Sequence, residues 1–351
     1  MRGPAGAYGM AASLLDMRLL LVTGKGGVGK STVCAALALS AAKRGKRVLL
    51  VEVTPREHFS RLLGVSPGGH VEHPVAENVW ALNLDPLIAL GEYFETQLHV
   101  RAVVRMIMGN PVFRRLVNVA PGWRDLITLG KVWHLERQQD PRSGRPKYDL
   151  FILDAPATGQ GLGFLRTPQA FVEAVRFGPA KTHSQWVRDL IEDPARTRLV
   201  LVTLPEELPV NETIEMARAL REKVRVPFEH VIVNAVAPKL FTDKEAKALR
   251  SLHEDAERSE RLSSALEGEA ALEDLLGAAD AAMSRRALHE HHLRRLQAHL
   301  GRHARGAAGG RQSAKTLIEL PFIYRSSLSV EDLRGLGEIL AADGKESPGA
   351  A

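Results

Sequence analysis

The sequence predicts an α/β fold: a doubly wound, mostly parallel sheet with helical insertions. Short apolar runs, about seven in number, are typical of strands that are buried on both faces. Stretches with the composition of helices separate these runs, and such alternation indicates a parallel sheet covered by helices. A glycine-rich phosphate-binding pattern follows the first run and opens the first helix.

The expected strands can be followed along the chain. The first is MRLLLVTG at residues 17–24, and the second is RVLLVEV at 47–53. The Ala- and Leu-rich stretch 30–46 between them suits a helix, so the three form a parallel strand–helix–strand unit. Five more runs continue the pattern: VWALNLD at 79–85, YDLFILDAP at 148–156, RLVLVTLPEE at 198–207, HVIVNAVAP at 230–238 and KTLIELPFI at 315–323.

Two longer stretches interrupt this alternation. Residues from about 86 to 139 contain no strand pattern, and residues from about 242 to 311 are rich in Ala, Leu, Glu, Arg and His. Both are expected to be helical insertions into a single P-loop domain that spans 17–342. Residues 1–16 are expected to form a flexible N-terminal extension, and the small, polar tail 343–351 is expected to be disordered.

The amino-acid composition excludes several kinds of protein and site. The 351 residues include one cysteine, Cys34, which excludes a disulfide framework and a paired CxxC zinc clasp within the chain. A net charge of +6 permits an anionic partner, but no basic pattern interleaved with aromatics indicates nucleic acid. No apolar run approaches the roughly 18 residues that a membrane helix needs, and the N-terminus is a poor signal peptide. A cytoplasmic location is therefore expected.

The phosphate-binding pattern lies in the stretch TGKGGVGKST. Gly24, Gly29, Lys30 and Ser31 match G-x-x-x-x-G-K-[ST] between an expected strand and an expected helix. Backbone N–H groups and the helix N-terminus are expected to cradle the phosphates of ATP, with Lys30 at the β- and γ-phosphates. The Ser31 hydroxyl is expected to ligate Mg²⁺. The expected nucleotide contacts in the loop are Gly24, Lys25, Gly26, Gly27, Val28, Gly29, Lys30, Ser31 and Thr32.

Lys25 is a second lysine at the start of the loop, where Lys30 already serves the loop's own phosphates. One interpretation is a solvated surface lysine. The other is that Lys25 crosses to a neighbouring subunit and stabilises the charge on that subunit's transferring phosphoryl group. The stretch KGGVGKS resembles the signature of the deviant Walker A ATPases. That resemblance implies a nucleotide-sandwich dimer in which Lys25 acts in trans.

A second site is expected where the strand at 148–154 ends. Asp154 lies at the C-terminal edge of the sheet, where ligands of parallel sheets bind, and a carboxylate there can hold Mg²⁺ through water. The alternative is a carboxylate that caps the next turn. Gly159, Gly161 and Gly163 then predict a mobile loop that is suited to sensing the γ-phosphate.

The stretch YDLFILDAPATGQGLGFLRTP, residues 148–168, resembles the switch II of the ArsA/Get family. Two further stretches resemble that family, TLPEELPVNET at 203–213 and VIVNAV at 231–236. The resemblance implies that Glu212 lies near the nucleotide across the dimer and that Asn234 hydrogen-bonds the base. From the residues alone, a first-turn helix charge and an ordinary turn former remain open for these two positions.

The resemblance fails at one position. The family's switch I carries an aspartate that positions the attacking water, and Thr54 stands there in this sequence. Glu52 and Glu57 lie close by, and each is either a substitute group or a structural side chain. Hydrolysis is therefore expected to be slow, to use a substitute group, or to be absent.

The expected function is a Mg²⁺-dependent ATPase that acts as a dimeric conformational switch, with Lys25, Lys30 and Asp154 as catalytic residues. The dimer is expected to form between two copies or with a related ATPase, and a protein or membrane protein is the candidate cargo. The alternative, suggested by Thr54, is a regulatory subunit that binds nucleotide with weak or no hydrolysis. A partitioning or division-site ATPase shares the phosphate loop but is disfavoured by the stretch 148–168.

Two features have open roles. The segment 285–305 is rich in His and Arg, with His289 and His292 three residues apart and His299 and His303 four apart. It is either a solvated basic helix or a metal site. The apolar residues of the first insertion either pack on the sheet or line a groove for a client helix, as the helical subdomain does in the targeting factors of the family.

Overall fold

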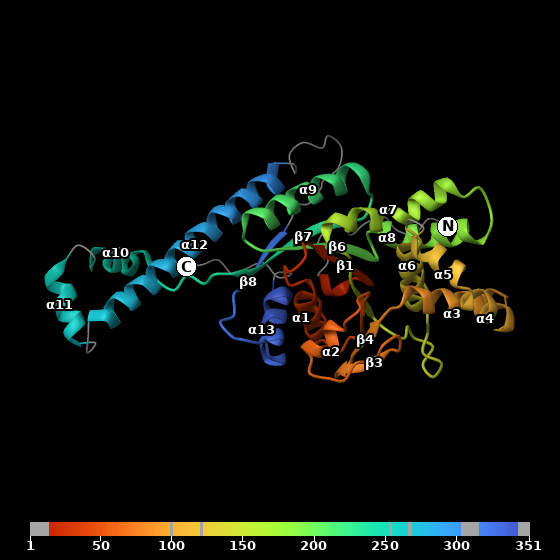
Figure 1. Ribbon diagram of the computed structural model, residues 1–351, viewed down its shortest axis with the longest axis horizontal. Coiled ribbons are helices and arrows are strands. Elements are labelled where there is room, and N and C mark those ends of the chain that lie inside the picture. The colour runs from red at the N-terminus through yellow and green to blue at the C-terminus, as the bar shows by residue number, and fades with distance from the viewer. Residues whose placement is uncertain are drawn as a thin grey trace, which may run out of the picture.

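The computed structural model describes residues 14–98, 101–119, 122–252, 255–265, 269–302 and 316–342. Its centre is one eight-stranded sheet in the order β3-β4-β2-β5-β1-β6-β7-β8, and every neighbouring pair except β3–β4 is parallel (Figure 1). The strands are β1 Leu19–Gly24, β2 Val48–Glu52, β3 His73–Ala76, β4 Val79–Asn83, β5 Leu150–Asp154, β6 Thr197–Thr203, β7 Phe228–Val236 and β8 Thr316–Pro321.

Helices cover both faces of this sheet. Alternate residues of each strand point to opposite faces, so Leu19 and Leu21 of β1 join one apolar core while Leu20 and Val22 join the other. The first core packs against α6 to α9 and α12, and the second packs against α1, α2 and α13. The prediction of a doubly wound, mostly parallel sheet is therefore confirmed. The helices on the two faces are α1 Lys30–Lys43, α2 His58–Leu62, α6 Trp123–Glu136, α7 Thr158–Ala174, α8 Pro179–Glu192, α9 Glu207–Lys223, α12 Glu269–Arg302 and α13 Val330–Ala342.

The strand order changes direction at β1, which lies between β5 and β6. In an open parallel sheet, such a switch point leaves a crevice at the carboxyl ends of the strands, where ligands bind. The register brings Asp154 of β5 level with Val22 of β1 and with Glu52 of β2. Acidic side chains from two strands therefore meet at the end of β1, beside the phosphate loop.

Strand β3 was not predicted from the sequence. It has four residues, pairs antiparallel with β4 at the edge of the sheet, and contains Pro74. An edge strand tolerates proline because one row of its backbone groups needs no partner. Such a short, mixed segment therefore lacks the continuous apolar run that marks the buried strands.

The two insertions extend from opposite ends of the molecule (Figure 1). The first consists of α6 with α3 Pro86–Leu98, α4 Arg101–Gly109 and α5 Pro111–Val119. The second consists of α10 Asp243–Leu252, α11 Ala256–Ala265 and the long helix α12. With 34 residues, α12 is about 51 Å long at 1.5 Å per residue. It therefore reaches from the sheet to the end of the second insertion, where α10 and α11 lie (Figure 1). Among the described helices, none is long and apolar enough to cross a membrane.

The N-terminal prediction needs a correction. Leu14–Asp16 form a short 3-10 helix, and Leu14 and Leu15 are buried against the core on the α1 side. The expected flexible extension 1–16 is therefore wrong for its last three residues, because two leucines gain apolar burial there. Residues 1–13, the linker 303–315 and the tail 343–351 lie outside the described residues.

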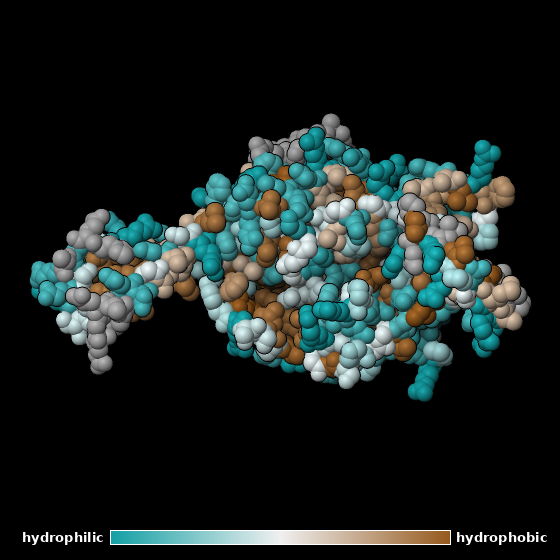
Figure 2. Space-filling model, in the orientation of Figure 1, coloured by the Kyte–Doolittle hydropathy of each residue, from teal (hydrophilic) through white to brown (hydrophobic). Residues whose placement is uncertain are grey.

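Some apolar residues of the first insertion pack within it, as one interpretation expected, and the groove for a client helix stays a prediction. Leu90 and Val104 are buried, so they pack the insertion together. Met106 and Val112 are 70% and 72% exposed, and Figure 2 shows apolar side chains interspersed with polar ones over this end of the molecule.

Candidate nucleotide-binding site

The phosphate loop joins β1 to α1 and needs glycine at two points. A Cβ at Gly24 would lie 2.0 Å from the carbonyl oxygen of Val202, and Gly29 has a φ of +89° immediately before the first turn of α1. These glycines let the loop curl back and direct the N-terminus of α1 at the phosphate position. The Lys30 Nζ lies 3.1 Å from the carbonyl oxygen of Lys25, so the ammonium group is folded over the loop.

Ser31 and Asp154 meet at the mouth of the loop. The Ser31 Oγ donates a 2.6 Å hydrogen bond to Oδ2 of Asp154. Burial raises the pKa of Asp154, while the Ser31 hydrogen bond and the Lys30 charge lower it. A hydroxyl and a carboxylate are hard oxygen donors, which Mg²⁺ prefers. The pair therefore fits the expected Mg²⁺ site, with Ser31 as a ligand and Asp154 in the outer shell, and both roles stay predictions.

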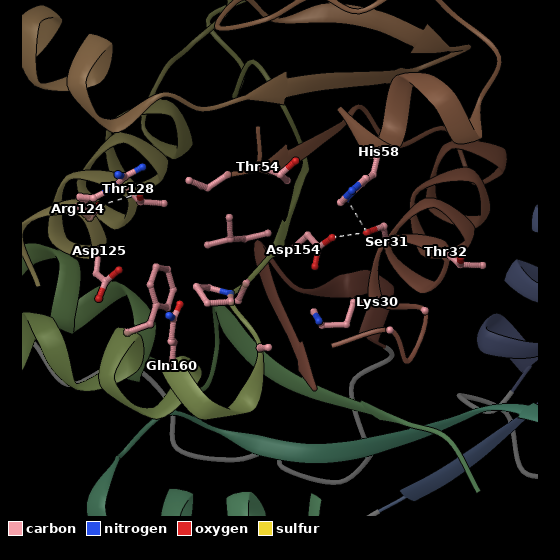
Figure 3. A pocket seen from close by; sticks show the side chains of 18 of the residues that line it. Lys30, Ser31, Thr32, Thr54, His58, Arg124, Asp125, Thr128, Asp154 and Gln160 are labelled. Carbon is pink, nitrogen blue, oxygen red and sulfur yellow. Dashed lines mark hydrogen bonds between the residues drawn. The ribbon is translucent and has the colours of Figure 1, made fainter. Parts of the chain in front are cut away.

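A cavity of about 690 Å³ lies beside the loop (Figure 3). The phosphate loop, the start of α1 and the end of β5 form one wall, and α2 contributes the turn that carries His58. The opposite wall comes from α6 of the first insertion and from α7. The residues of that wall are Arg124, Asp125, Thr128, Gln160 and Phe164. The insertion therefore faces the nucleotide position directly, which the sequence did not indicate.

The second lysine of the loop has a partner in its own chain. The Lys25 ammonium forms an ion pair with the Glu212 carboxylate, whose other oxygen accepts a 2.8 Å hydrogen bond from the Thr158 hydroxyl. The hydrogen bond from Lys25 is the main cause that lowers the pKa of Glu212. The Lys25 and Glu212 side chains are 32% and 36% exposed. The pair thus links the loop, α7 and α9 at the surface; the trans roles expected for both residues stay predictions.

Asn234 braces the phosphate loop. Its Nδ2 donates a 3.0 Å hydrogen bond to the carbonyl oxygen of Val28. The next residue, Ala235, has a φ of +56°, and this left-handed conformation lies at the irregularity in the β7–β8 pairing between Val233 and Val236. Asn234 therefore fixes the loop against β7, and its contact with the base stays a prediction.

Helix α12 holds the chain just after β7. Nδ1 of His289 accepts a 3.0 Å hydrogen bond from the Ala237 N–H, and Arg286 donates a 2.9 Å bond to the Ala237 carbonyl oxygen. His289 and His292 are buried, and burial lowers the pKa of both imidazoles. A solvated helix is therefore wrong for these two residues. No cluster of three metal-ligating side chains occurs in the described part of the chain, and His303 lies outside it.

The switch I region uses two of its polar side chains to hold its own backbone. The Thr54 hydroxyl donates to the Arg56 carbonyl oxygen and accepts a 3.0 Å hydrogen bond from the Arg56 N–H. Glu57 accepts hydrogen bonds from the N–H groups of Gly68 and Gly69, at 3.0 and 2.6 Å. Thr54 closes a turn and Glu57 fixes a loop, so the geometry favours the structural interpretation of Glu57.

Glu52 is buried and caps helix α2. It is 1% exposed and accepts hydrogen bonds from the N–H groups of His58 at 3.0 Å and Phe59 at 3.3 Å. Burial raises the pKa of Glu52 to about 7. The cap places His58 at the cavity, where its Nδ1 lies 3.5 Å from the Ser31 Oγ (Figure 3). His58 was missed in the sequence because a single histidine in a turn has no spacing pattern.

The glycines after Asp154 lie in a helix. Because α7 begins at Thr158, Gly159, Gly161 and Gly163 occupy its first two turns, and the predicted mobile loop is wrong in this structure. A Cβ at Gly161 would lie 3.0 Å from the Thr23 Oγ1, so the small residue allows α7 to pack closely on the end of β1. Packing outweighs the low helix propensity of glycine here.

Comparisons with known proteins identify the family. The family model for anion-transporting ATPases matches residues 17–183 and 178–264. The ATPase BagA of Mycobacterium tuberculosis is 36% identical over 237 residues, which cover 66% of this chain and 69% of that protein. An arsenical pump-driving ATPase of Acidiphilium multivorum is 24% identical over 246 residues, which cover 65% of this chain and 41% of that protein. With the loop, the strand-end aspartate and the sheet order described above, these matches show that the chain belongs to the ArsA-type family of anion-transporting ATPases.

Proposed function

We propose that the chain binds ATP with Mg²⁺ and hydrolyses it as one subunit of a cytoplasmic dimer, and that the cycle moves the helical insertions, which receive a protein cargo. The observation that supports this most is the position of Lys25 on the exposed rim of the loop. Its partner within the chain is Glu212, and both side chains of this ion pair are about one-third exposed. Such pairs are worth about 1 kcal/mol or less, so the ammonium can exchange this carboxylate for a partner's phosphate at small cost.

The remaining groups have separate roles in the proposed site. The loop N–H groups and Lys30 hold the triphosphate, and Ser31 and Asp154 hold the metal ion. When bound, Mg²⁺ supplies positive charge at the β- and γ-phosphates. Because α6 lines the far wall of the same cavity, a change at the γ-phosphate can reach the first insertion through Arg124 and Thr128.

The experiment compares wild type, Lys25→Ala and Lys43→Ala. Lys43 is a matched control, since it forms an exposed ion pair with Glu338, at 2.6 Å, at the C-terminal end of α1, away from the loop. Light scattering with Mg²⁺ and a non-hydrolysable ATP analogue measures mass, and steady-state turnover measures hydrolysis. We expect dimers and turnover for wild type and Lys43→Ala, and turnover at least about 100-fold lower for Lys25→Ala. A wild-type monomer under these conditions contradicts the proposal.

A regulatory subunit is the second candidate. This candidate is favoured by two hydrogen bonds. The Thr54 hydroxyl already bonds to the Arg56 backbone and the Glu57 carboxylate to the Gly69 N–H, so neither group is free to orient an attacking water. If this candidate is right, calorimetry detects ATP binding while the chain alone shows no turnover. Turnover then appears when a related ATPase subunit with an intact switch I aspartate is added.

A further inference from the structure

Helix α6 separates two cavities. Arg124, Asp125 and Thr128 line the nucleotide cavity. Other residues of α6, among them Gly130 and His134, line a second cavity of about 240 Å³ that α3 and α8 complete. One helix therefore forms a wall of both spaces, and a ligand in the second cavity contacts an element that also faces the nucleotide.

The second cavity has flat aromatic walls. Trp133 lines it and is stacked on Trp186, with ring centroids 4.9 Å apart and an angle of 13° between the planes. Tyr93 and His183 line it from α3 and α8, with their rings edge to face at 87° and Tyr93 Oη 2.7 Å from His183 Nδ1. Rigid aromatic faces and edges of this kind favour a planar ligand that stacks against them.

The charges around this cavity are compensated. Lys131 pairs with Glu92 at 2.6 Å, and the contacts of Glu92 with His70 and Lys131 lower its pKa to about 2. Burial lowers the pKa of the His134 and His183 imidazoles, which favours their neutral forms. A charged ligand would therefore lose its hydration without gaining an opposite charge.

One polar side chain of this cavity is available for a ligand. His134 lines the cavity, and its ring nitrogens can meet a donor or an acceptor. The residue is exposed, so water otherwise meets these nitrogens. A ligand that combines a flat apolar ring with a single hydroxyl or N–H group would hydrogen-bond to this imidazole in place of water.

The volume limits the size of the ligand. An apolar cavity of about 150 Å³ holds one benzene ring, so 240 Å³ fits about two fused rings. A protein helix, about 10 Å across with its side chains, does not fit. We infer that the cavity between α3, α6 and α8 binds a small, uncharged, planar aromatic molecule, and that its occupancy is coupled to nucleotide binding through α6. This goes beyond the proposed ATPase cycle, in which the insertions receive a protein cargo.

The test uses 2-naphthol, a neutral two-ring phenol, in calorimetric titrations of the full chain without nucleotide. The charged analogue is 2-naphthoate. Gly130→Leu fills the cavity from α6, where an added Cβ meets no atom within 4 Å, and leucine favours the helix. Gly335→Leu is the matched control, a helical glycine of α13 with equally open surroundings, remote from the cavity.

We expect 2-naphthol to bind wild type and Gly335→Leu with a dissociation constant on the order of 10–100 µM. Binding of 2-naphthoate to wild type, and of 2-naphthol to Gly130→Leu, should each be at least about tenfold weaker. No binding of 2-naphthol, equal binding of naphthoate, or full binding by Gly130→Leu overturns the site. Since these titrations need neither ATP nor turnover, their failure is distinct from failure of the proposed function.

The coupling has its own readout. Saturating ADP should change the 2-naphthol dissociation constant of wild type by about fivefold or more, and saturating 2-naphthol should change the ADP constant by the same factor. Gly130→Leu should show no effect of 2-naphthol on ADP affinity. Equal constants with and without the other ligand in wild type overturn the coupling.

Discussion

Replacing Glu52 by Gln should remove a pH dependence of stability that the fold builds into this position. The buried carboxyl has a pKa of about 7 in the folded chain, against an ordinary value of 4.5. Between these two values the folded state holds the proton and the unfolded state does not, so raising the pH favours unfolding. Each pH unit in this window costs about 1.4 kcal/mol, and the cost levels off near pH 7. The total for wild type is about 2 kcal/mol between pH 5.5 and pH 8.

Urea unfolding at several pH values measures this effect. The quantity of interest is the unfolding free energy of wild type minus that of Glu52→Gln, because other titrating groups cancel in the difference. The glutamine keeps one oxygen to accept the His58 N–H, so helix α2 retains part of its cap. We expect the difference to fall by about 2 kcal/mol from pH 5.5 to pH 8. A difference that stays constant within about 0.5 kcal/mol would refute the reasoning.

Three further predictions concern the loop, the metal site and α12. Gly29→Ala should lower the unfolding free energy, measured by urea denaturation, by about 2 kcal/mol, because Gly29 has a φ of +89° and an added Cβ would lie 2.2 Å from Asn234 Nδ2. In the control Gly26→Ala the added Cβ meets nothing within 4 Å, so the unfolding free energy should change by less than about 0.5 kcal/mol. Asp154→Asn should reduce the gain in ADP affinity on adding Mg²⁺ about tenfold, measured by calorimetry with Mg²⁺ and with EDTA, and an unchanged gain would argue against its metal role. His289→Ala should cost about 1–3 kcal/mol in thermal or urea unfolding, because it leaves a buried backbone N–H without its acceptor, and a neutral result would show that water replaces the imidazole.

The sequence is sufficient for the parts of the fold that local pattern determines. Strands such as β1 are buried on both faces, so their apolar runs are uninterrupted and easy to find. The phosphate loop is equally local, since its glycines, Lys30 and Ser31 lie within eight residues of chain. Short edge strands such as β3 and the glycine-rich start of α7 were not predicted, because partner strands and packing against β1 decide them.

The rest of the site depends on contacts between distant segments. Lys25 and Glu212 are 187 residues apart, and their pairing follows from the positions of α9 and the loop on adjoining strands β6 and β1. His58 reaches the cavity because Glu52 caps α2, which no motif encodes. The far wall from α6 likewise requires the insertion to fold back over the ends of the strands. Such features follow from tertiary packing and not from residue spacing.

A mixing experiment tests the central claim, that Lys25 of one chain serves the ATP bound by another. Lys25→Ala retains its own Lys30, and Lys30→Ala retains its own Lys25, so each variant alone should be inactive. In an equal mixture, half of the dimers are mixed and each has one complete site, so turnover should recover to about a quarter of wild type. A mixture of folded variants that remains as inactive as its components would contradict the account.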